Sequence, residues 1–272
     1  MKLKLFKNSV RLTLLFILVP LAASVHAADL SIFHAEPPAE SSSRTFDHSE
    51  WSDILSKYIS ELNGLNYFRY GQVTEDDFER LEDYIEDLES VAVTELDADQ
   101  QFAYWVNLYN ALTVWVILEH YPVDSIRDIS FSLLTRGPWK EEFVSVQDVD
   151  LTLDNIEHDI LRPVYEDNRI HYAVNCASIG CPNLQNVAFT AENLEEQLEK
   201  AAREYVNHPR GARIEDDELI VSSIYDWYRE DFGDSEIGVI EHLLEYASGE
   251  LAEELQEFDE IDDYEYDWRL NE

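Results

Sequence analysis

Two cysteines, Cys176 and Cys181, are the residues of this 272-residue chain that are best suited to covalent chemistry. They follow an apolar run, HYAVNC, and residues 169–176 are therefore predicted to form a buried strand. Four residues separate the cysteines, a spacing typical neither of a zinc knuckle nor of a thioredoxin-like redox motif. Three interpretations stay open: a small structural disulfide, one nucleophilic cysteine beside a bystander, and two buried free thiols.

A nucleophilic thiol needs a base or a positive charge nearby to lower its pKa. His158 lies on a helix predicted over residues 155–164, and Asp154 is both the expected cap of this helix and a group that can orient the imidazole. His171 precedes Cys176 by five positions in the predicted strand, and an odd offset places their side chains on opposite faces. His158 is therefore the preferred base. For each histidine taken alone, a structural role is the simpler interpretation.

Two asparagines, Asn107 and Asn110, lie on one face of the stretch 100–120, which is apolar on nearly every side and predicts a helix buried all round. An unpaired buried amide costs about 1–3 kcal/mol, so both side chains need partners. We favour the interpretation in which they hold a neighbouring loop, for example the loop of Cys176. In the sharper alternative one of them donates to a developing oxyanion, and the catalytic residues would be Cys176, His158, Asn107 and Asn110.

The hydrophobic pattern places helices first and then strands mixed with helices, which is an α+β layout and not regular βαβ repetition. By analogy, a helical N-terminal part packed on a small sheet suggests a papain-like or transglutaminase-like fold. In such folds the cysteine usually begins the buried helix, a position that this helix does not offer. Helices are expected to begin at Ser49, Thr74, Thr190 and Ser235, and strands are expected within residues 141–153 and 219–225.

Several segments in one order carry a further signal: FAYWVNLYNALTVW (102–115), LTLDNIEHDILRP (151–163), RIHYAVNCASIGCPNL (169–184), AFTAENLEEQL (188–198), VSSIYDWYREDFG (221–233) and YDWRLN (266–271). Together they resemble domain-of-unknown-function family 547, over roughly residues 50 to 271. The resemblance implies a globular domain with no agreed activity, whose terminal YDWRLN segment belongs to the fold. It also favours a role for His158, because IEHDILR is part of the shared pattern. The turn at residues 177–180 departs from the sequence usual in the family.

The N-terminus has the features of a secretory signal, with four basic residues before an apolar run at residues 12–19 and small residues before Ala27. We expect cleavage after Ala27, since the run is too short to span a bilayer. Residues 1–27 are then the signal peptide, 28–47 a linker and 48–272 a single globular domain. The expected location is the periplasm or the surrounding medium, with no membrane span after cleavage.

The formal net charge of −39 repels nucleic acid and anionic lipid, so neither is an expected partner. The chain has no phosphate-binding loop, Rossmann glycine pattern, GxSxG elbow or HExxH motif. We therefore expect neither a cofactor nor a metal ion.

Two functions follow from these patterns. The first is a thiol-dependent hydrolase or acyl-transfer enzyme that acts on a peptide, an envelope amide or a small acyl compound. In it Cys176 attacks the acyl group, His158 moves the proton, and an asparagine amide or backbone N–H groups bind the oxyanion. The second is a non-enzymatic exported binding or structural domain with a Cys176–Cys181 disulfide.

Overall fold

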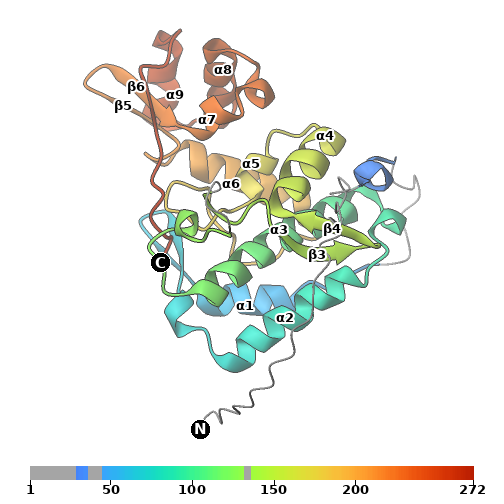
Figure 1. Ribbon diagram of the computed structural model, residues 1–272. Coiled ribbons are helices and arrows are strands. Elements are labelled where there is room, and N and C mark those ends of the chain that lie inside the picture. Colours follow the sequence, from blue (N-terminus) through green and yellow to red (C-terminus); the bar gives the residue numbers. More distant parts are fainter. Residues whose placement is uncertain (1–28, 36–44, 132–135) are drawn as a thin grey trace, which may run out of the picture.

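Figure 1 shows the computed structural model, which describes residues 29–35, 45–131 and 136–272. The predicted signal peptide and its cleavage site after Ala27 lie outside the described residues. The α-helices are α1 (Ser49–Tyr58), α2 (Glu75–Glu89), α3 (Ala98–His120), α4 (Arg162–Tyr165), α5 (Ile170–Ala173), α6 (Leu194–Val206), α7 (Ile224–Trp227), α8 (Glu236–Tyr246) and α9 (Gly249–Glu254). The strands are β1 (Ile59–Leu62), β2 (Leu65–Phe68), β3 (Glu142–Val146), β4 (Val149–Thr152), β5 (Ala212–Glu215), β6 (Glu218–Ser222) and β7 (Asp263–Glu265). A π-helix, η5 (Asn155–Leu161), runs directly into α4, and 3₁₀ turns are η1 (Leu30–His34), η2 (Tyr70–Gln72), η3 (Val93–Glu95), η4 (Ile126–Asp128), η6 (Arg229–Phe232) and η7 (Leu255–Glu257).

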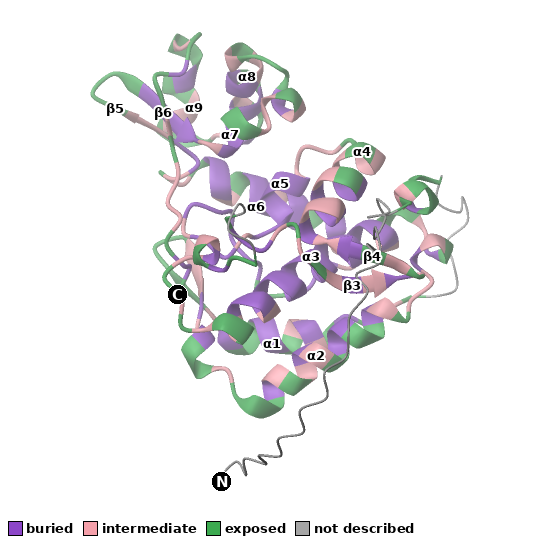
Figure 2. Cartoon of the chain, viewed as in Figure 1, coloured by how far each residue is buried: buried purple, intermediate pink, exposed green. Residues whose placement is uncertain are grey.

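Helix α3 forms the centre of the larger core, as its sequence predicts. Every residue from Gln101 to Val114 is buried, and Figure 2 shows this helix enclosed by the other elements. The side chain of Asp97 caps its first turn by accepting a hydrogen bond from the Gln100 amide at 3.0 Å. Within the described part of the chain, no helix combines the length and the apolarity that a membrane crossing needs.

The sheets are small, and the described structure confirms the α+β class. β1 with β2 and β3 with β4 form two antiparallel pairs, and the third sheet has the order β5-β6-β7 with β7 parallel to β6. The third sheet packs with α6 to α9 around a second apolar core (Figure 1). The analogy to papain-like or transglutaminase-like folds stays a prediction.

The strand predicted over residues 169–176 is wrong. Residues Ile170–Ala173 form one buried helical turn, α5, and the chain is extended from Val174. The Val174 amide donates to the carbonyl of Ile170 at 3.0 Å, which closes the turn. A short run that is apolar on all sides has no periodicity to separate a buried strand from a buried helical turn.

Asp154 is not the cap of the following helix. Its backbone is already helical, with φ −58° and ψ −42°, and its side chain makes no capping hydrogen bond. The Thr152 hydroxyl accepts from the Asn155 amide at 3.0 Å instead. The helix therefore starts two residues earlier than predicted, at Leu153, and the carboxylate of Asp154 is available to the pocket described below.

The described part of the predicted linker packs against the domain. Leu30–His34 forms η1, and its Phe33 is buried edge-to-face on Trp105, with ring centroids 5.0 Å apart. The ring of His34 also contacts the Asp159 carbonyl at 2.6 Å. Residues 36–44 of the predicted linker lie outside the described residues.

The C-terminal segment belongs to the fold, as the family resemblance implies. Asn271 is buried, and its carbonyl accepts from the Phe68 amide at 2.8 Å while its amide donates to the carbonyl of Ala177 at 3.2 Å. The hydroxyl of Tyr70, which is itself buried, donates to Asn271 Oδ1 at 3.0 Å. These bonds tie the last residues to β2 and to the turn between the cysteines.

We expect Asn271→Ala to lower the free energy of unfolding by about 1–3 kcal/mol, because the Tyr70 hydroxyl loses its acceptor in a buried position. Urea unfolding monitored by circular dichroism measures the change. Gln256→Ala removes an exposed amide from a helix end and is the control, with little expected effect. Equal stabilities for the two variants would contradict the structural role of Asn271.

The second core contains a buried histidine, His242, whose ring contacts the Tyr172 hydroxyl at 2.6 Å and Asn168 Nδ2 at 3.2 Å. Burial lowers the pKa of His242 to about 4, with a smaller contribution from the charge of His171. The folded state thus resists protonation of this ring, which the unfolded chain accepts near pH 6.5. Its contribution to stability is complete above that pH and is lost as the pH falls through about 4.

We therefore expect the free energy of unfolding to fall between about pH 6.5 and pH 5 by up to about 1.4 kcal/mol per unit from this group. His242→Gln keeps a hydrogen-bonding amide but cannot be protonated, so its unfolding free energy should change less over this range. Urea titrations at several pH values give both slopes. Identical slopes for the wild type and His242→Gln would refute the assignment.

Candidate functional site

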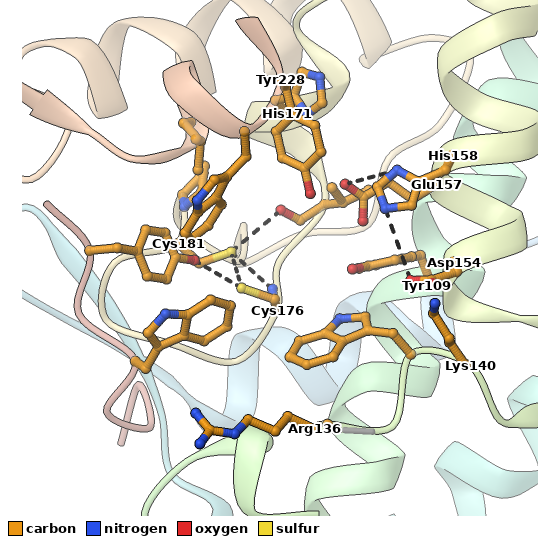
Figure 3. Close-up of a pocket in the computed structure, with 18 residues that line it drawn as sticks. Tyr109, Arg136, Lys140, Asp154, Glu157, His158, His171, Cys176, Cys181 and Tyr228 are labelled. Carbon is orange, nitrogen blue, oxygen red and sulfur yellow. Dashed lines mark hydrogen bonds and ion pairs between the residues drawn. The ribbon is translucent and has the colours of Figure 1, made fainter. Parts of the chain in front are cut away.

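A cavity of about 460 Å³ lies where elements of the larger core meet the C-terminal segments. Figure 3 shows that its wall carries Cys176 and Cys181 on one side, and His158, Glu157 and Asp154 on the other. Tyrosine and tryptophan side chains supply much of the remaining wall. The cavity therefore joins the sequence-predicted nucleophile and the sequence-predicted base in one space.

The two cysteines are free thiols in close contact. Their Sγ atoms lie 2.9 Å apart, and the Cys176 amide also lies 2.9 Å from the Cys181 sulfur. The Cys176 sulfur is further hydrogen-bonded to the Ser178 hydroxyl at 3.2 Å and the Tyr266 hydroxyl at 3.0 Å. Cys176 is partly exposed, whereas Cys181 is buried. Of the two thiols on the cavity wall, Cys176 is therefore the more accessible to a molecule in the cavity.

These contacts shift the pKa values of the two thiols in opposite directions. The hydrogen bond from Cys181 lowers the pKa of Cys176 against the opposing effect of burial, with help from the hydroxyls of Ser178 and Tyr266. Burial raises the pKa of Cys181, and donation of its proton to Cys176 raises it further. The pair therefore favours a thiolate on Cys176 and a protonated thiol on Cys181.

Asn175, which is not among the residues predicted for the site, fixes the backbone of the cysteine loop. Its side chain accepts from the Ala177 amide at 2.8 Å and donates to the Pro182 carbonyl at 2.7 Å, so it bridges both ends of the turn. Ala177 has a φ of 55°, a left-handed conformation that costs energy for a residue with a side chain. The sequence signal for this role was an asparagine within an apolar run, directly before Cys176.

The turn between the cysteines also pairs with the C-terminal segment. The amides of Ile179 and Gly180 donate to the carbonyls of Arg269 and Asp267, each at 2.8 Å. A Cβ on Gly180 would lie 2.7 Å from the Asp267 nitrogen, so this close approach requires glycine. The same segment carries Tyr266 and thereby brings its hydroxyl to the sulfur.

Asn107 and Asn110 hold loops, as the favoured interpretation has it. Asn110 donates to the Ala173 carbonyl at 2.9 Å and accepts from the Asn175 amide at 2.8 Å, which fixes the entry to the cysteine loop. Asn107 donates to the Phe189 carbonyl at 2.7 Å and accepts from the same residue's amide at 3.0 Å. Neither side chain lines the cavity. The structure thus brings together Cys176 and His158, with the asparagines behind the wall.

Glu157 lines the cavity together with His158, although neighbouring residues in an α-helix do not face the same way. η5 is a π-helix, whose wider turn brings both Glu157 and His158 to the cavity. Glu157 Oε1 lies 3.9 Å from His158 Nδ1, and Asp154 Oδ1 lies 3.9 Å from His158 Nε2. Glu157 is buried, and His158 Nδ1 is a buried nitrogen with no hydrogen-bond partner among the described residues. The imidazole therefore lies between two carboxylates, and its Nδ1 can still form a hydrogen bond.

His171 also lines the cavity, although the predicted strand placed it on the opposite face from Cys176. Its Nε2 lies 2.7 Å from Asp231 Oδ2, which Arg162 Nε also contacts at 2.6 Å. Burial opposes ionisation of Asp231, yet the bonds from His171 and Arg162 lower its pKa well below the ordinary value. The His171 ring stacks on Tyr228 with centroids 4.3 Å apart. This histidine is therefore firmly held in a hydrogen-bonded network.

Neither imidazole is hydrogen-bonded to Cys176 in the described structure. Figure 3 shows His158 across the cavity from Cys176, with the space of the cavity between them. A histidine in this position can exchange protons with a molecule in the cavity without touching the sulfur. Among the described residues, no group of three or more His, Cys, Asp or Glu side chains could hold a metal ion.

The fold and the cavity define an α+β protein with a polarised pair of thiols in a largely aromatic pocket. A family model described as "Protein of unknown function, DUF547" matches residues 93–206. The match includes α3, η5 and both cysteines, and it confirms the resemblance to this family over that segment. No curated protein and no solved structure matches the chain.

Removal of the Tyr266 hydroxyl should raise the pKa of Cys176, because the thiolate loses one of its donors. For Tyr266→Phe we therefore expect an upward shift of the Cys176 pKa. The rate of iodoacetamide labelling of the Cys176 peptide, followed against pH by mass spectrometry, reports this pKa. Tyr264→Phe, which removes a hydroxyl bonded to Arg229 and not to either sulfur, is the control. An unshifted profile in Tyr266→Phe would contradict the role of this bond.

Proposed function

We propose that the chain is a thiol-dependent hydrolase or acyl-transfer enzyme in which Cys176 is the nucleophile. The observation that carries the proposal is a partly exposed Cys176 thiol, with its pKa lowered by hydrogen bonds, on the wall of a cavity of about 460 Å³. A lowered pKa increases the fraction of thiolate at a given pH, and a cavity of this size admits a small acyl group or part of a peptide. Placement outside the cytoplasm is part of the same proposal and rests on the N-terminal sequence pattern.

The acylation step begins with attack of the Cys176 thiolate on the carbonyl carbon of the substrate. A carbon–sulfur bond forms, and the carbonyl electrons move to the oxygen. Their return breaks the bond to the leaving amine or alcohol, which takes a proton from the protonated His158 across the cavity. The products of this step are a thioester on Cys176 and a neutral imidazole.

The second step restores the enzyme. Neutral His158 takes a proton from water, or from another acceptor, as its oxygen attacks the thioester carbonyl. The carbon–sulfur bond then breaks, and the acid or the transferred acyl product leaves with Cys176 again a thiolate. The nearby carboxylates of Asp154 and Glu157 stabilise the imidazolium that carries the proton between the two steps.

This scheme explains why no base touches the sulfur. Cys181, Ser178 and Tyr266 already favour the thiolate, so His158 is free to serve the leaving group and the incoming water. The Tyr266 hydroxyl, 3.0 Å from the sulfur, is the side-chain donor in position to bond the oxyanion as it forms. Asn107 and Asn110 act on this step only through the loops that they hold.

Turnover of p-nitrophenyl acetate tests the proposal. Cys176→Ser should abolish turnover and the acetyl adduct on the Cys176 peptide. His158→Gln should slow turnover about a hundredfold but leave the pKa of Cys176 seen by alkylation unchanged, because no hydrogen bond joins the two side chains. His120→Gln, at the far end of α3 with its ring on the Val116 carbonyl, is the control. Turnover that survives in Cys176→Ser would end the proposal.

The second candidate is the non-enzymatic exported domain with a Cys176–Cys181 disulfide. The observation in its favour is the 2.9 Å contact between the two sulfurs, which an oxidant could join with little movement of the loop. Titration of thiols in the exported protein, denatured without reductant, separates the two candidates. Two free thiols support the enzyme, and none supports the disulfide.

A further inference from the structure

The second thiol, Cys181, is not a reactant in the proposed acyl chemistry. It is 6% exposed, and its sulfur lies 2.9 Å from the sulfur of Cys176 (Figure 3). As a hydrogen-bond donor it duplicates the hydroxyls of Ser178 and Tyr266, which contact the same sulfur at 3.2 and 3.0 Å. A thiol differs from these hydroxyls in one important property, because oxidation can join its sulfur covalently to that of Cys176.

The turn between the cysteines holds the two sulfurs together. The Cys181 amide donates to the carbonyl of Ser178 at 3.0 Å, and the Cys176 amide donates to the Cys181 sulfur at 2.9 Å. The side chain of Asn175 is bonded to both ends of this turn. A sulfur–sulfur bond is about 2.05 Å long, so its formation needs only a small approach of two atoms that already touch.

An oxidant in the cavity meets Cys176 first. Cys176 is the more exposed of the two thiols, and the cavity of about 460 Å³ that it lines admits a small hydroperoxide. Hydroperoxides oxidise the thiolate form, which the hydrogen bonds to Cys176 favour by lowering its pKa. Burial raises the pKa of Cys181, so this sulfur stays protonated and is protected from direct oxidation. An accessible thiolate beside a protected thiol is typical of redox-active cysteine pairs.

We propose that the two thiols reduce hydroperoxides, with Cys176 as the attacking sulfur and Cys181 as the thiol that resolves the product. The Cys176 thiolate attacks the terminal oxygen of the hydroperoxide, so that a sulfur–oxygen bond forms as the oxygen–oxygen bond breaks. The departing alkoxide, or hydroxide in the case of hydrogen peroxide, takes a proton from the solvent. Cys176 is then a sulfenic acid, and the hydroperoxide has become an alcohol or water.

The second step uses the contact between the two sulfurs. The Cys181 sulfur attacks the sulfenic sulfur, so that a sulfur–sulfur bond forms and the sulfur–oxygen bond breaks. The departing hydroxide takes the Cys181 proton and leaves as water. Two thiols and one hydroperoxide thus give one disulfide, one water and one alcohol, or two waters from hydrogen peroxide. An external dithiol restores both thiols by exchange and is itself oxidised to a disulfide. This reaction goes beyond the proposed acyl chemistry and shares with it only the nucleophile.

Oxidation of the full reduced chain by hydrogen peroxide and by cumene hydroperoxide tests the inference. We expect one molecule of oxidant to be consumed per chain, and intact-protein mass spectrometry should show the loss of two hydrogen atoms. Peptide mapping should place the disulfide between Cys176 and Cys181, and dithiothreitol should reopen it in the folded protein. Oxidation by either reagent that is faster than that of N-acetylcysteine at the same pH supports the inference, and the faster reagent identifies the class of hydroperoxide.

Two matched variants separate the roles of the sulfurs. Cys181→Ser keeps a hydrogen-bond donor beside Cys176 but cannot form the disulfide. Its Cys176 should give a sulfenic acid that dimedone labels, and should proceed to sulfinic acid in excess oxidant. Cys176→Ser leaves the buried thiol alone, and Cys181 should stay reduced over the same time. Circular dichroism checks that both variants are folded.

Oxidation no faster than that of N-acetylcysteine, disulfides between chains, or a bond that dithiothreitol does not open in the folded protein would each overturn the inference. Equal formation of sulfinic acid in the wild type and in Cys181→Ser would do the same. Turnover of p-nitrophenyl acetate by the reduced wild type separates this failure from failure of the proposed function. A chain that oxidises and recovers its thiols but never turns over the ester supports this inference and refutes the acyl chemistry.

Discussion

The amide of Asn110 is the contact on which the arrangement of the cavity depends. It lies inside a helix that is buried on nearly every side, and it satisfies the carbonyl of Ala173 and the amide of Asn175. These groups are buried, where an unpaired backbone group is costly, so the bonds favour one position for the chain that enters the cysteine loop. The side chain of Asn175 in turn is hydrogen-bonded to both ends of the turn between the cysteines. The positions of the two sulfurs therefore depend on α3.

The elements that the sequence predicts well are those with a strong period or an evident cap. α3 has no polar face. Thr74 caps α2, and its hydroxyl accepts a hydrogen bond from the Asp77 amide. Residues 142–152 form the two short strands β3 and β4 that their alternating apolar and polar residues predict. The structural interpretation of Asn107 and Asn110 follows from the same reasoning, since a polar side chain in so apolar a helix must find a partner. In these places local chemistry and tertiary packing agree.

The misses lie where tertiary contacts decide. The segment at residues 169–176 is apolar throughout, so neither strand nor helix leaves a pattern, and bonds from Asn110 set its course. Glu157 shares the cavity with its neighbour His158, which α-helical geometry does not predict and the π-helix allows. Tyr266 reaches Cys176 across 90 residues, and no local rule connects them. The proposed nucleophile and the proposed base were predicted from the sequence, whereas the residues that contact them were identified only in the fold.

The position of Tyr266 and Trp268 in the chain has a consequence for biogenesis. These side chains complete one wall of the cavity, and they are held there by the pairing of residues 267–271 with the cysteine turn and with β2. They are also the last of the cavity residues to leave the ribosome. A nascent chain can form α3 while this wall is still missing. The thiol of Cys176 then lacks one of its hydrogen-bond donors until Tyr266 is in place.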